Sequence, residues 1–215
     1  MALQRISYPD RASWLAGRTE QGIGASECAA AVGMSPWMTT SELWAIKTGQ
    51  KKNKDVSDNS SVERGNRMED AIRYFYACAH PDCTIEYHPY DILFQSERPW
   101  QFATLDGEIL TPDGRLGILE IKTGTPVGKD GWAQWDNRVP DGYFIQCLAQ
   151  LLATGYDFVV LQAALWSRNG DVTLKDPYLF ERSEQEEDIA WLLGKLEEFW
   201  HSVETRTLPK LSIQF

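Results

Sequence analysis

The residues with the clearest chemical potential are two acids and a lysine in the pattern D-x(13)-E-x-K, formed by Asp106, Glu120 and Lys122. Glu120 and Lys122 lie in the hexapeptide Gly-Ile-Leu-Glu-Ile-Lys, where branched aliphatic residues alternate with charged ones. This alternation predicts a strand with one buried face, on which both charged side chains point to the same side. A Thr-Pro-Asp-Gly turn at 111–114 would fold the preceding segment back and bring Asp106 toward Glu120.

Two carboxylates and one ammonium group on a rigid face suit metal-dependent hydrolysis of a phosphodiester. Mg²⁺ prefers carboxylate and water oxygens, and a bound ion lowers the pKa of its water and neutralises charge on the phosphate. The carbonyl of Ile121, between the glutamate and the lysine, is a candidate for a further oxygen ligand. Lys122 would hold or deprotonate the attacking water, or offset charge in the transition state. The alternative is that Glu120 and Lys122 form a salt bridge on a solvated strand face.

A glycine-rich turn at 22–33 leads into a helix of small residues and indicates a possible phosphate site. Ser26 stands where this helix would begin, and the amides and dipole of a helix N-terminus favour an anion. Arg18, eight residues earlier, can make a bidentate contact with a phosphate. The alternative is an ordinary capped helix with close glycine and alanine packing.

Two further predicted helices carry polar residues that can reach the same site. In the first, an amphipathic helix, Glu69 lies beside the apolar stripe and either reaches inward as a metal or water ligand or remains a surface charge. In the second, at 139–155, Gln146 shares one face with Tyr143 and Gln150. Gln146 could hold the scissile phosphate or the nucleophilic water, or it could cap a neighbouring backbone.

These motifs follow one another in a recognisable order. They are G-I-G-A-S-E, R-G-N-R-M-E, L-D-G, L-E-I-K and P-x-x-Y-x-x-Q, from about Trp14 to Gly155. The ordered set resembles the phage lambda exonuclease-like, YqaJ-type viral recombinase nucleases of the PD-(D/E)-x-K superfamily. Leu105 replaces the proline usual before the first aspartate, and Arg18 is one residue farther from Ser26 than in the family pattern.

The resemblance implies a role for each candidate residue. The implied metal ligands are Asp106, Glu120 and the backbone carbonyl of Ile121. The implied catalytic residues are Lys122, Glu69 and Gln146. The implied pocket for the 5′-terminal phosphate is formed by Arg18, Ser26 and Thr104.

The resemblance also implies an activity. It is the Mg²⁺-dependent, processive 5′→3′ digestion of linear double-stranded DNA, with two Mg²⁺ ions per active site and Mn²⁺ as the alternative ion. The 5′-phosphorylated strand would be released as mononucleotides, which leaves a 3′ single-stranded overhang for phage-type homologous recombination. Known members form trimeric rings, so we expect a homotrimeric toroid that acts on DNA ends. A single-strand annealing protein is the implied partner.

Length and composition predict one folded domain over residues 1–215, and the resemblance implies that it is a nuclease domain. By resemblance the fold class is α/β (α+β), with a restriction-endonuclease-like core in which α-helices flank a central mixed β-sheet. The last element should be an acidic helix at about 183–205, where Ser183 forms a capping box with Glu186. The four cysteines lack the grouping that the iron–sulfur nucleases of this superfamily require.

The formal net charge of −10 at first argues against a nucleic-acid substrate. Much of the negative charge is local, however, since residues 181–204 contain eight acidic and two basic residues. A basic segment, which either contacts phosphates or forms a solvated loop, contains Lys47, Lys51, Lys52 and Lys54. Trp132 and Trp135 either stack on a DNA base or are buried in the core.

The chain shows no apolar signal segment and no run of 18 apolar residues, so we expect a cytoplasmic protein that does not act in a membrane. The resemblance implies a bacterial host and a phage or prophage origin. Two other functions remain open. One is a structure- or sequence-specific metal-dependent endonuclease of the same superfamily, which would not need a 5′-phosphate pocket. The other is a catalytically silent subunit that binds DNA ends, for which clustered carboxylates would bring no benefit.

Overall fold

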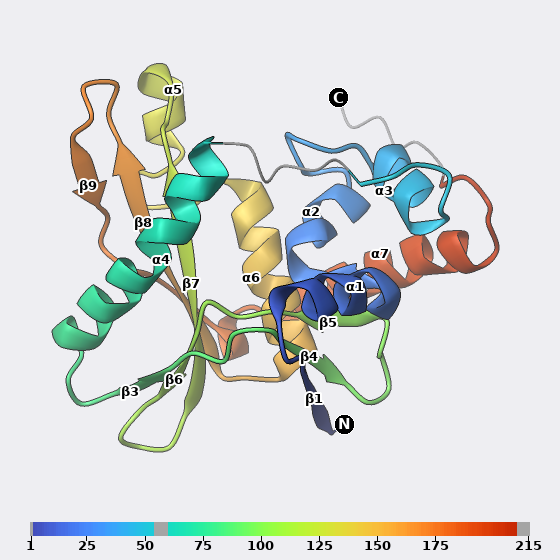
Figure 1. Cartoon of the computed structure of the whole chain (residues 1–215), viewed down its shortest axis with the longest axis horizontal. Coiled ribbons are helices and arrows are strands. Elements are labelled where there is room, and N and C mark those ends of the chain that lie inside the picture. Colours follow the sequence, from blue (N-terminus) through green and yellow to red (C-terminus); the bar gives the residue numbers. More distant parts are fainter. Residues whose placement is uncertain (1, 54–59, 210–215) are drawn as a thin grey trace.

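The computed structural model describes residues 2–53 and 60–209, and within them the strands form a sheet of six and a sheet of four (Figure 1). The larger sheet has the order β10-β8-β7-β6-β3, with β9 paired to β8 off this path. Its strands are β3 (Thr84–Glu86), β6 (Gly107–Leu110), β7 (Leu116–Gly124), β8 (Phe158–Trp166), β9 (Val172–Leu174) and β10 (Tyr178–Glu181).

The larger sheet is mixed, because β7 and β8 run parallel while the other neighbouring strands run antiparallel. Parallel neighbours need a long crossover. Here the chain returns through α5 (Gly128–Ala133) and α6 (Asp141–Thr154). The expected mixed sheet flanked by helices is therefore confirmed.

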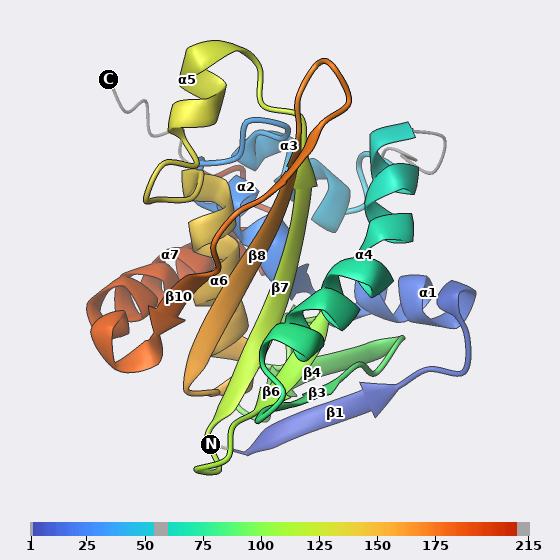
Figure 2. The same ribbon diagram turned by 90° about the vertical axis from the view of Figure 1, so that its left-hand side faces the viewer.

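The two faces of this sheet are covered by different helices, as Figure 2 shows for β7 and β8 between α4 and α6. Ile118 and Leu161 belong to the core cluster that contains the apolar residues of α6 and of α7 (Glu186–Glu204). Leu119 and Ile121 belong to a second cluster, which includes Ile72 from α4 (Ser60–Ala79). The alternation of β7 thus sends neighbouring residues into separate cores.

The smaller sheet has the order β1-β4-β5-β2. Its strands are β1 (Leu3–Ser7), β4 (Asp91–Gln95), β5 (Gln101–Ala103) and β2 (Ile23–Gly24). Arg5 on β1 joins the two sheets, since Nη1 donates to Oδ2 of Asp91 at 2.7 Å and Nη2 donates to Oε1 of Glu108 on β6 at 2.6 Å. The remaining helices at this end are α1 (Arg11–Gln21), the short η1 (Ala25–Glu27) and α2 (Cys28–Ala31), and α3 (Thr40–Lys47).

The acidic C-terminal helix is present, but the expected capping box at Ser183 is wrong. Residues 182–184 form the 3₁₀ turn η2, and α7 begins at Glu186 without a side-chain cap. Arg182 explains the delay, because its backbone N–H donates to the carbonyl of Asp157 and its Nη1 to the carbonyl of Leu151. These bonds hold the chain in a turn before the helix starts. The apolar stripe of α7 is buried at Ile189, Leu192, Leu196 and Phe199, and Leu193 is half-buried.

Packing resolves the two interpretations of Trp132 and Trp135 that the sequence left open. Trp135 is only 5% exposed and Trp132 packs against the same core, so burial explains both residues better than stacking on DNA. Cys28 and Cys147 are buried free thiols.

Among the helices of the described residues, none combines the length and the apolar character needed to cross a lipid bilayer.

Replacing Gly22 with alanine tests the turn that leads into β2. Gly22 has a φ of +136°, and an added Cβ would lie 2.1 Å from the carbonyl oxygen of Trp100. Gly114 is a matched control, with a φ of +87° and no atom within 4 Å of such a Cβ. We expect Gly114→Ala to lower the free energy of unfolding by about 1 kcal/mol and Gly22→Ala by at least about 2 kcal/mol more. Chemical denaturation measures both, and equal losses would contradict the backbone clash.

Candidate active site

The charged residues of β7 share a face, as their spacing predicts. The Glu120 side chain is only 2% exposed, and Nζ of Lys122 lies 2.5 Å from its Oε1. Lys122 is also mostly buried, with its ammonium group 5.0 Å from the ring centroid of Tyr143 on α6. A solvated salt bridge on an open strand face is therefore excluded.

Helix α6 supplies two more hydrogen-bond donors to Glu120. Nε2 of Gln146 donates to Oε1 at 2.7 Å, and Nε2 of Gln150 donates to Oε2 at 2.5 Å. Residues four apart lie on one face of a helix, so both amides can reach the same carboxylate. Gln146 consequently contacts the acidic centre and does not cap a backbone. The contact of Gln150 was not predicted, although its spacing from Gln146 was the available signal.

Asp106 is brought to β7 by the hairpin of β6 and β7, in which Gly107 lies opposite Leu119. Its Oδ2 accepts a hydrogen bond from the backbone N–H of Ile121 at 2.8 Å. The N–H and C=O groups of one strand residue point to the same edge. The carbonyl of Ile121 therefore points to the edge on which Asp106 lies, where it can serve as the predicted oxygen ligand.

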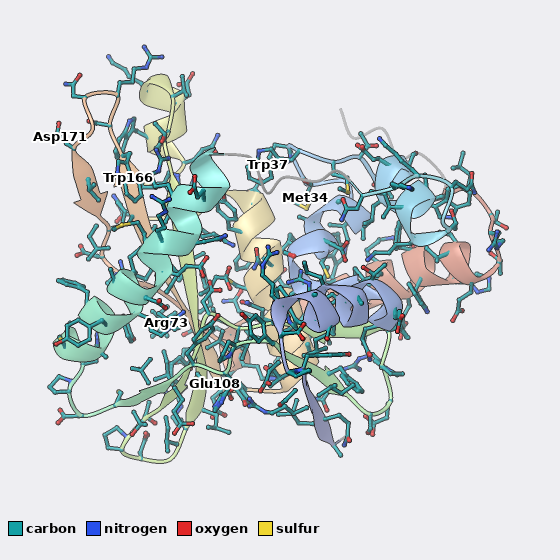
Figure 3. The ribbon with its side chains drawn as sticks, in the orientation of Figure 1. Met34, Trp37, Arg73, Glu108, Trp166 and Asp171 are labelled. Carbon is teal, nitrogen blue, oxygen red and sulfur yellow. The ribbon has the colours of Figure 1, made fainter. Side chains whose placement is uncertain are left out.

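Arg73 on α4 contacts Asp106, which the sequence did not predict. Figure 3 labels this residue on α4. Its Nε donates to the backbone carbonyl of Asp106 at 2.5 Å, and its guanidinium group lies 3.8 Å from the ring centroid of Tyr87. Arg73 stands four residues after Glu69, which places both on the same side of the helix. That spacing could have identified Arg73 as a neighbour of the site.

Burial and mutual repulsion dominate the electrostatics of the acids. Burial, followed by the charge of Glu120, raises the pKa of Asp106 well above its usual range, while Lys122 opposes the shift. The pKa of Glu69 is also raised, by burial above all, with Glu120 adding to the shift and Arg73 opposing it. Glu69 therefore lies within the field of the cluster. Among the described residues its carboxylate makes no hydrogen bond.

Burial acts on the pKa of Lys122 in the opposite direction to its effect on the acids. Burial by itself would lower the pKa of its ammonium group, but the charges of Glu120 and Asp106 outweigh that effect, and the pKa is raised. Three carboxylates and one ammonium group give this cluster a formal charge of −2.

The donor set fits a divalent cation. No group of three or more His, Cys, Asp or Glu side chains within residues 2–53 and 60–209 is close enough to hold a metal ion, so Asp106 and Glu120 would do so as a pair. Mg²⁺ is commonly held by one or two carboxylates and several waters. Oε1 of Gln150 is a buried acceptor without a partner in the described chain, which suits a water molecule beside Glu120. A divalent cation would also neutralise the formal charge of −2 on this cluster.

The three residues of the predicted phosphate pocket lie together. Nη1 of Arg18 donates to Oγ1 of Thr104 at 3.2 Å, and Nη2 donates to Oγ of Ser26 at 3.4 Å. Burial lowers the pKa of Arg18, while the charges of Glu27 and Asp106 oppose the shift. Thr104, which Arg18 contacts, precedes Asp106 by only two residues, and the charge of Asp106 acts on Arg18, so the pocket lies beside the carboxylate cluster.

Ser26 is not at the start of a long helix, which corrects the expectation of a helix-dipole anion site. It lies in η1, ahead of the four-residue helix α2. The carboxylate of Glu27 already accepts the N–H of Gly24 at 2.9 Å and pairs with Lys47 at 2.7 Å. A phosphate would therefore be bound here by side chains and not by a helix end.

The basic segment is only partly available to DNA. Lys47 pairs with Glu27 and donates to the carbonyl of Gly22, while Lys51 pairs with Glu42. Lys54 lies outside the described residues.

The sequence of this chain is similar to that of a known protein family. The YqaJ-like viral recombinase domain matches residues 13–157, a span that contains every site residue described above. The chain belongs to this family. It is 25% identical over 200 residues to "Uncharacterized protein YqaJ" of Bacillus subtilis (strain 168), and the match covers 93% of this chain and 58% of that protein.

Two solved structures share the fold of this family member. An alkaline exonuclease (LHK-Exo) from Laribacter hongkongensis is similar with a TM-score of 0.69 at 17% identity, over 92% of this chain and 94% of that chain. A phage-related exonuclease from Haemophilus somnus 129PT is similar with a TM-score of 0.54 at 12% identity, over 86% and 96% respectively. At these identities the likeness establishes the fold.

Asp106→Asn tests the electrostatic strain of the cluster. Because the folded protein holds the Asp106 proton to a higher pH than the unfolded chain does, the free energy of unfolding falls as pH rises through the raised pKa. Asparagine keeps an acceptor for the Ile121 N–H and carries no charge. In EDTA, we expect the variant to melt at least about 2 °C above the wild type at pH 8, with a smaller difference at pH 5.

Asp130→Asn, on the exposed surface of α5, is the matched control and should leave the melting temperature unchanged at both pH values. Differential scanning calorimetry gives the comparison. A wild type more stable than the Asp106→Asn variant at pH 8 would show that the buried charge is not strained.

Proposed function

We propose that this YqaJ family member is a divalent-metal-dependent exonuclease that digests double-stranded DNA from an end, 5′→3′, and releases mononucleotides. The observation that carries the proposal is the position of the Arg18 pocket beside Asp106. A phosphate clamp next to a hydrolytic centre selects a strand terminus, because an internal phosphodiester has no free terminal phosphate to fill it. The resulting 3′ overhang would serve recombination by strand annealing.

In this proposal, different side chains bind the terminal phosphate and stabilise the charge at the phosphodiester that is cut. Arg18 would bind the terminal phosphate through both nitrogens, aided by the hydroxyl groups of Ser26 and Thr104. The next phosphodiester would then lie at Asp106 and Glu120. Lys122 is held in its charged form by these carboxylates, so its ammonium group is available to offset negative charge on the phosphoryl group under attack.

The carboxylates also define the expected cofactor. Asp106, Glu120 and the Ile121 carbonyl would hold Mg²⁺, with Mn²⁺ as the alternative, and a second ion per site is part of the proposal. Bound metal supplies a water of lowered pKa and neutralises phosphate charge. Gln146 and Gln150 would keep Glu120 in a fixed orientation toward the ion.

A second structure of LHK-Exo supports a nucleotide substrate. It is described as a complex with dAMP, and it is similar to this chain with a TM-score of 0.63 at 18% identity over 92% of the chain. We further propose a homotrimeric toroid that passes its product strand to a single-strand annealing protein in a bacterial cytoplasm. Multi-angle light scattering tests the trimer.

The activity is tested by comparing linear 5′-phosphorylated duplex DNA with closed circular duplex DNA, in Mg²⁺ and in EDTA. We expect loss of the linear DNA alone, only with Mg²⁺, and release of mononucleotides. Cutting of the circle would instead identify an endonuclease on the same fold. Inertness on both substrates, with DNA-end binding retained, would identify a silent subunit.

Lys122→Ala should reduce the rate of digestion by at least about 100-fold, because one positive charge at the developing anion is lost. Binding to DNA ends, measured by fluorescence anisotropy with Ca²⁺ in place of Mg²⁺, should stay within a few-fold of the wild type. A variant that digests normally would remove Lys122 from the mechanism.

Arg18→Ala should abolish the preference for 5′-phosphorylated over 5′-hydroxyl ends, because the guanidinium group that recognises the phosphate is gone. The measurement is the ratio of initial rates on the two ends. Arg11→Ala, an exposed arginine on the same helix α1, should retain the wild-type ratio. A wild type without any preference would contradict the role of the pocket.

A further inference from the structure

Trp37 is an exposed aromatic residue close to the active site. Its side chain is 72% exposed, more than that of any other tryptophan in the chain, and it lies in the loop between α2 and α3 (Figure 3). Fully burying a large side chain is worth about 1.5–3 kcal/mol, so leaving an indole in water forgoes that gain. A contact outside the folded chain would recover it.

The ring of Trp37 is connected to the catalytic lysine through a single tyrosine. The centroids of Trp37 and Tyr143 are 5.8 Å apart, and Nζ of Lys122 lies 5.0 Å from the Tyr143 centroid. These two separations place the Trp37 centroid no farther than 10.8 Å from Nζ. DNA rises about 3.4 Å per nucleotide along one strand, so Trp37 lies within about three nucleotides of the phosphate at Lys122.

The support behind Trp37 is rigid. Tyr143 also contacts Trp135, with centroids 5.6 Å apart, and Trp135 is buried in the core. The hydroxyl group of Tyr178 donates to the carbonyl of Trp135 at 2.6 Å. The Trp37 ring therefore contacts a group of tilted aromatic rings that is anchored in the core, while most of the residue faces solvent.

The loop that carries Trp37 is tied to the helix that follows the phosphate pocket. The N–H of Met34 donates to the carbonyl of Ala29 at 2.8 Å, and Oγ1 of Thr40 donates to the carbonyl of Ala30 at 2.9 Å. Both acceptors are on α2, which directly follows η1 and Ser26. The exposed ring and the phosphate pocket are consequently held at a fixed separation.

We propose that Trp37 is a stacking platform for a base within the first three nucleotides of the strand that is digested. The inference rests on the proposed function and names a base subsite for the same reaction. An indole can stack on any base, and one base–aromatic contact is worth about 1–3 kcal/mol. A platform of this kind holds the strand end away from its complement without imposing a sequence preference, which suits an enzyme that must digest every sequence.

The test combines a protein variant with a DNA variant. A duplex with a 5′-phosphate carries an abasic residue at the first, second or third position of the phosphorylated strand. Its dissociation constant is measured with Ca²⁺ for the wild type, Trp37→Ala, Trp37→Phe and Trp191→Ala. Trp191 is a matched control, because it is exposed on α7, outside the site.

We expect Trp37→Ala to weaken binding of the intact end by at least about 5-fold, and Trp37→Phe to retain most of the affinity. At one of the three positions, the abasic residue should weaken the wild type by a similar factor and have no further effect on Trp37→Ala. That loss of additivity identifies direct stacking. Trp191→Ala should behave as the wild type does with every DNA.

Additive effects of Trp37→Ala and the abasic residues at all three positions would overturn the platform. So would a change of oligomeric state in Trp37→Ala by light scattering, since Trp37 would then serve a subunit contact. The proposed function fails separately, if the wild type leaves linear duplex DNA intact in Mg²⁺. Digestion by the wild type together with additive binding effects would refute only the platform.

Discussion

The buried carboxylate of Glu120 is the interaction on which the arrangement of the molecule depends. A charge removed from water costs several kcal/mol unless donors compensate it. The donors come from two places, since Lys122 lies two residues farther along β7 and the two glutamines lie one turn apart on α6. Helix α6 must therefore dock with Gln146 and Gln150 toward the sheet. The docking of this helix also places Tyr143 under the lysine.

The position of Asp106 depends on the strand that carries Glu120. The Ile121 N–H holds the carboxylate of Asp106 and Arg73 holds its backbone carbonyl, so β7 and α4 both position this residue. The negative charge gathered here contrasts with the acidic α7, whose exposed acids belong to the surface. The overall charge of the chain thus says little about its substrate, because the acids serve two different purposes.

The sequence predicted those features that depend on local periodicity. The shared face of Glu120 and Lys122 follows from the two-residue period of a strand, and the shared face of Gln146 and Gln150 follows from the period of a helix. The features that the sequence did not predict have a common cause. The contact of Arg73 with Asp106 and the turn at Arg182 depend on carbonyl groups far away in the chain, and no local pattern reports where those groups will lie.

The connection from β5 to β6 passes from the smaller sheet to the larger one, and it carries Thr104 and Asp106 only two residues apart. Two residues of chain span at most about 7 Å. The peptide backbone itself therefore limits the separation between the proposed phosphate clamp and the proposed catalytic carboxylate. In the proposed exonuclease, the short segment from Thr104 to Asp106 would fix the distance between the bound terminal phosphate and the bond that is cut. Covalent geometry would thereby determine the length of each excised product.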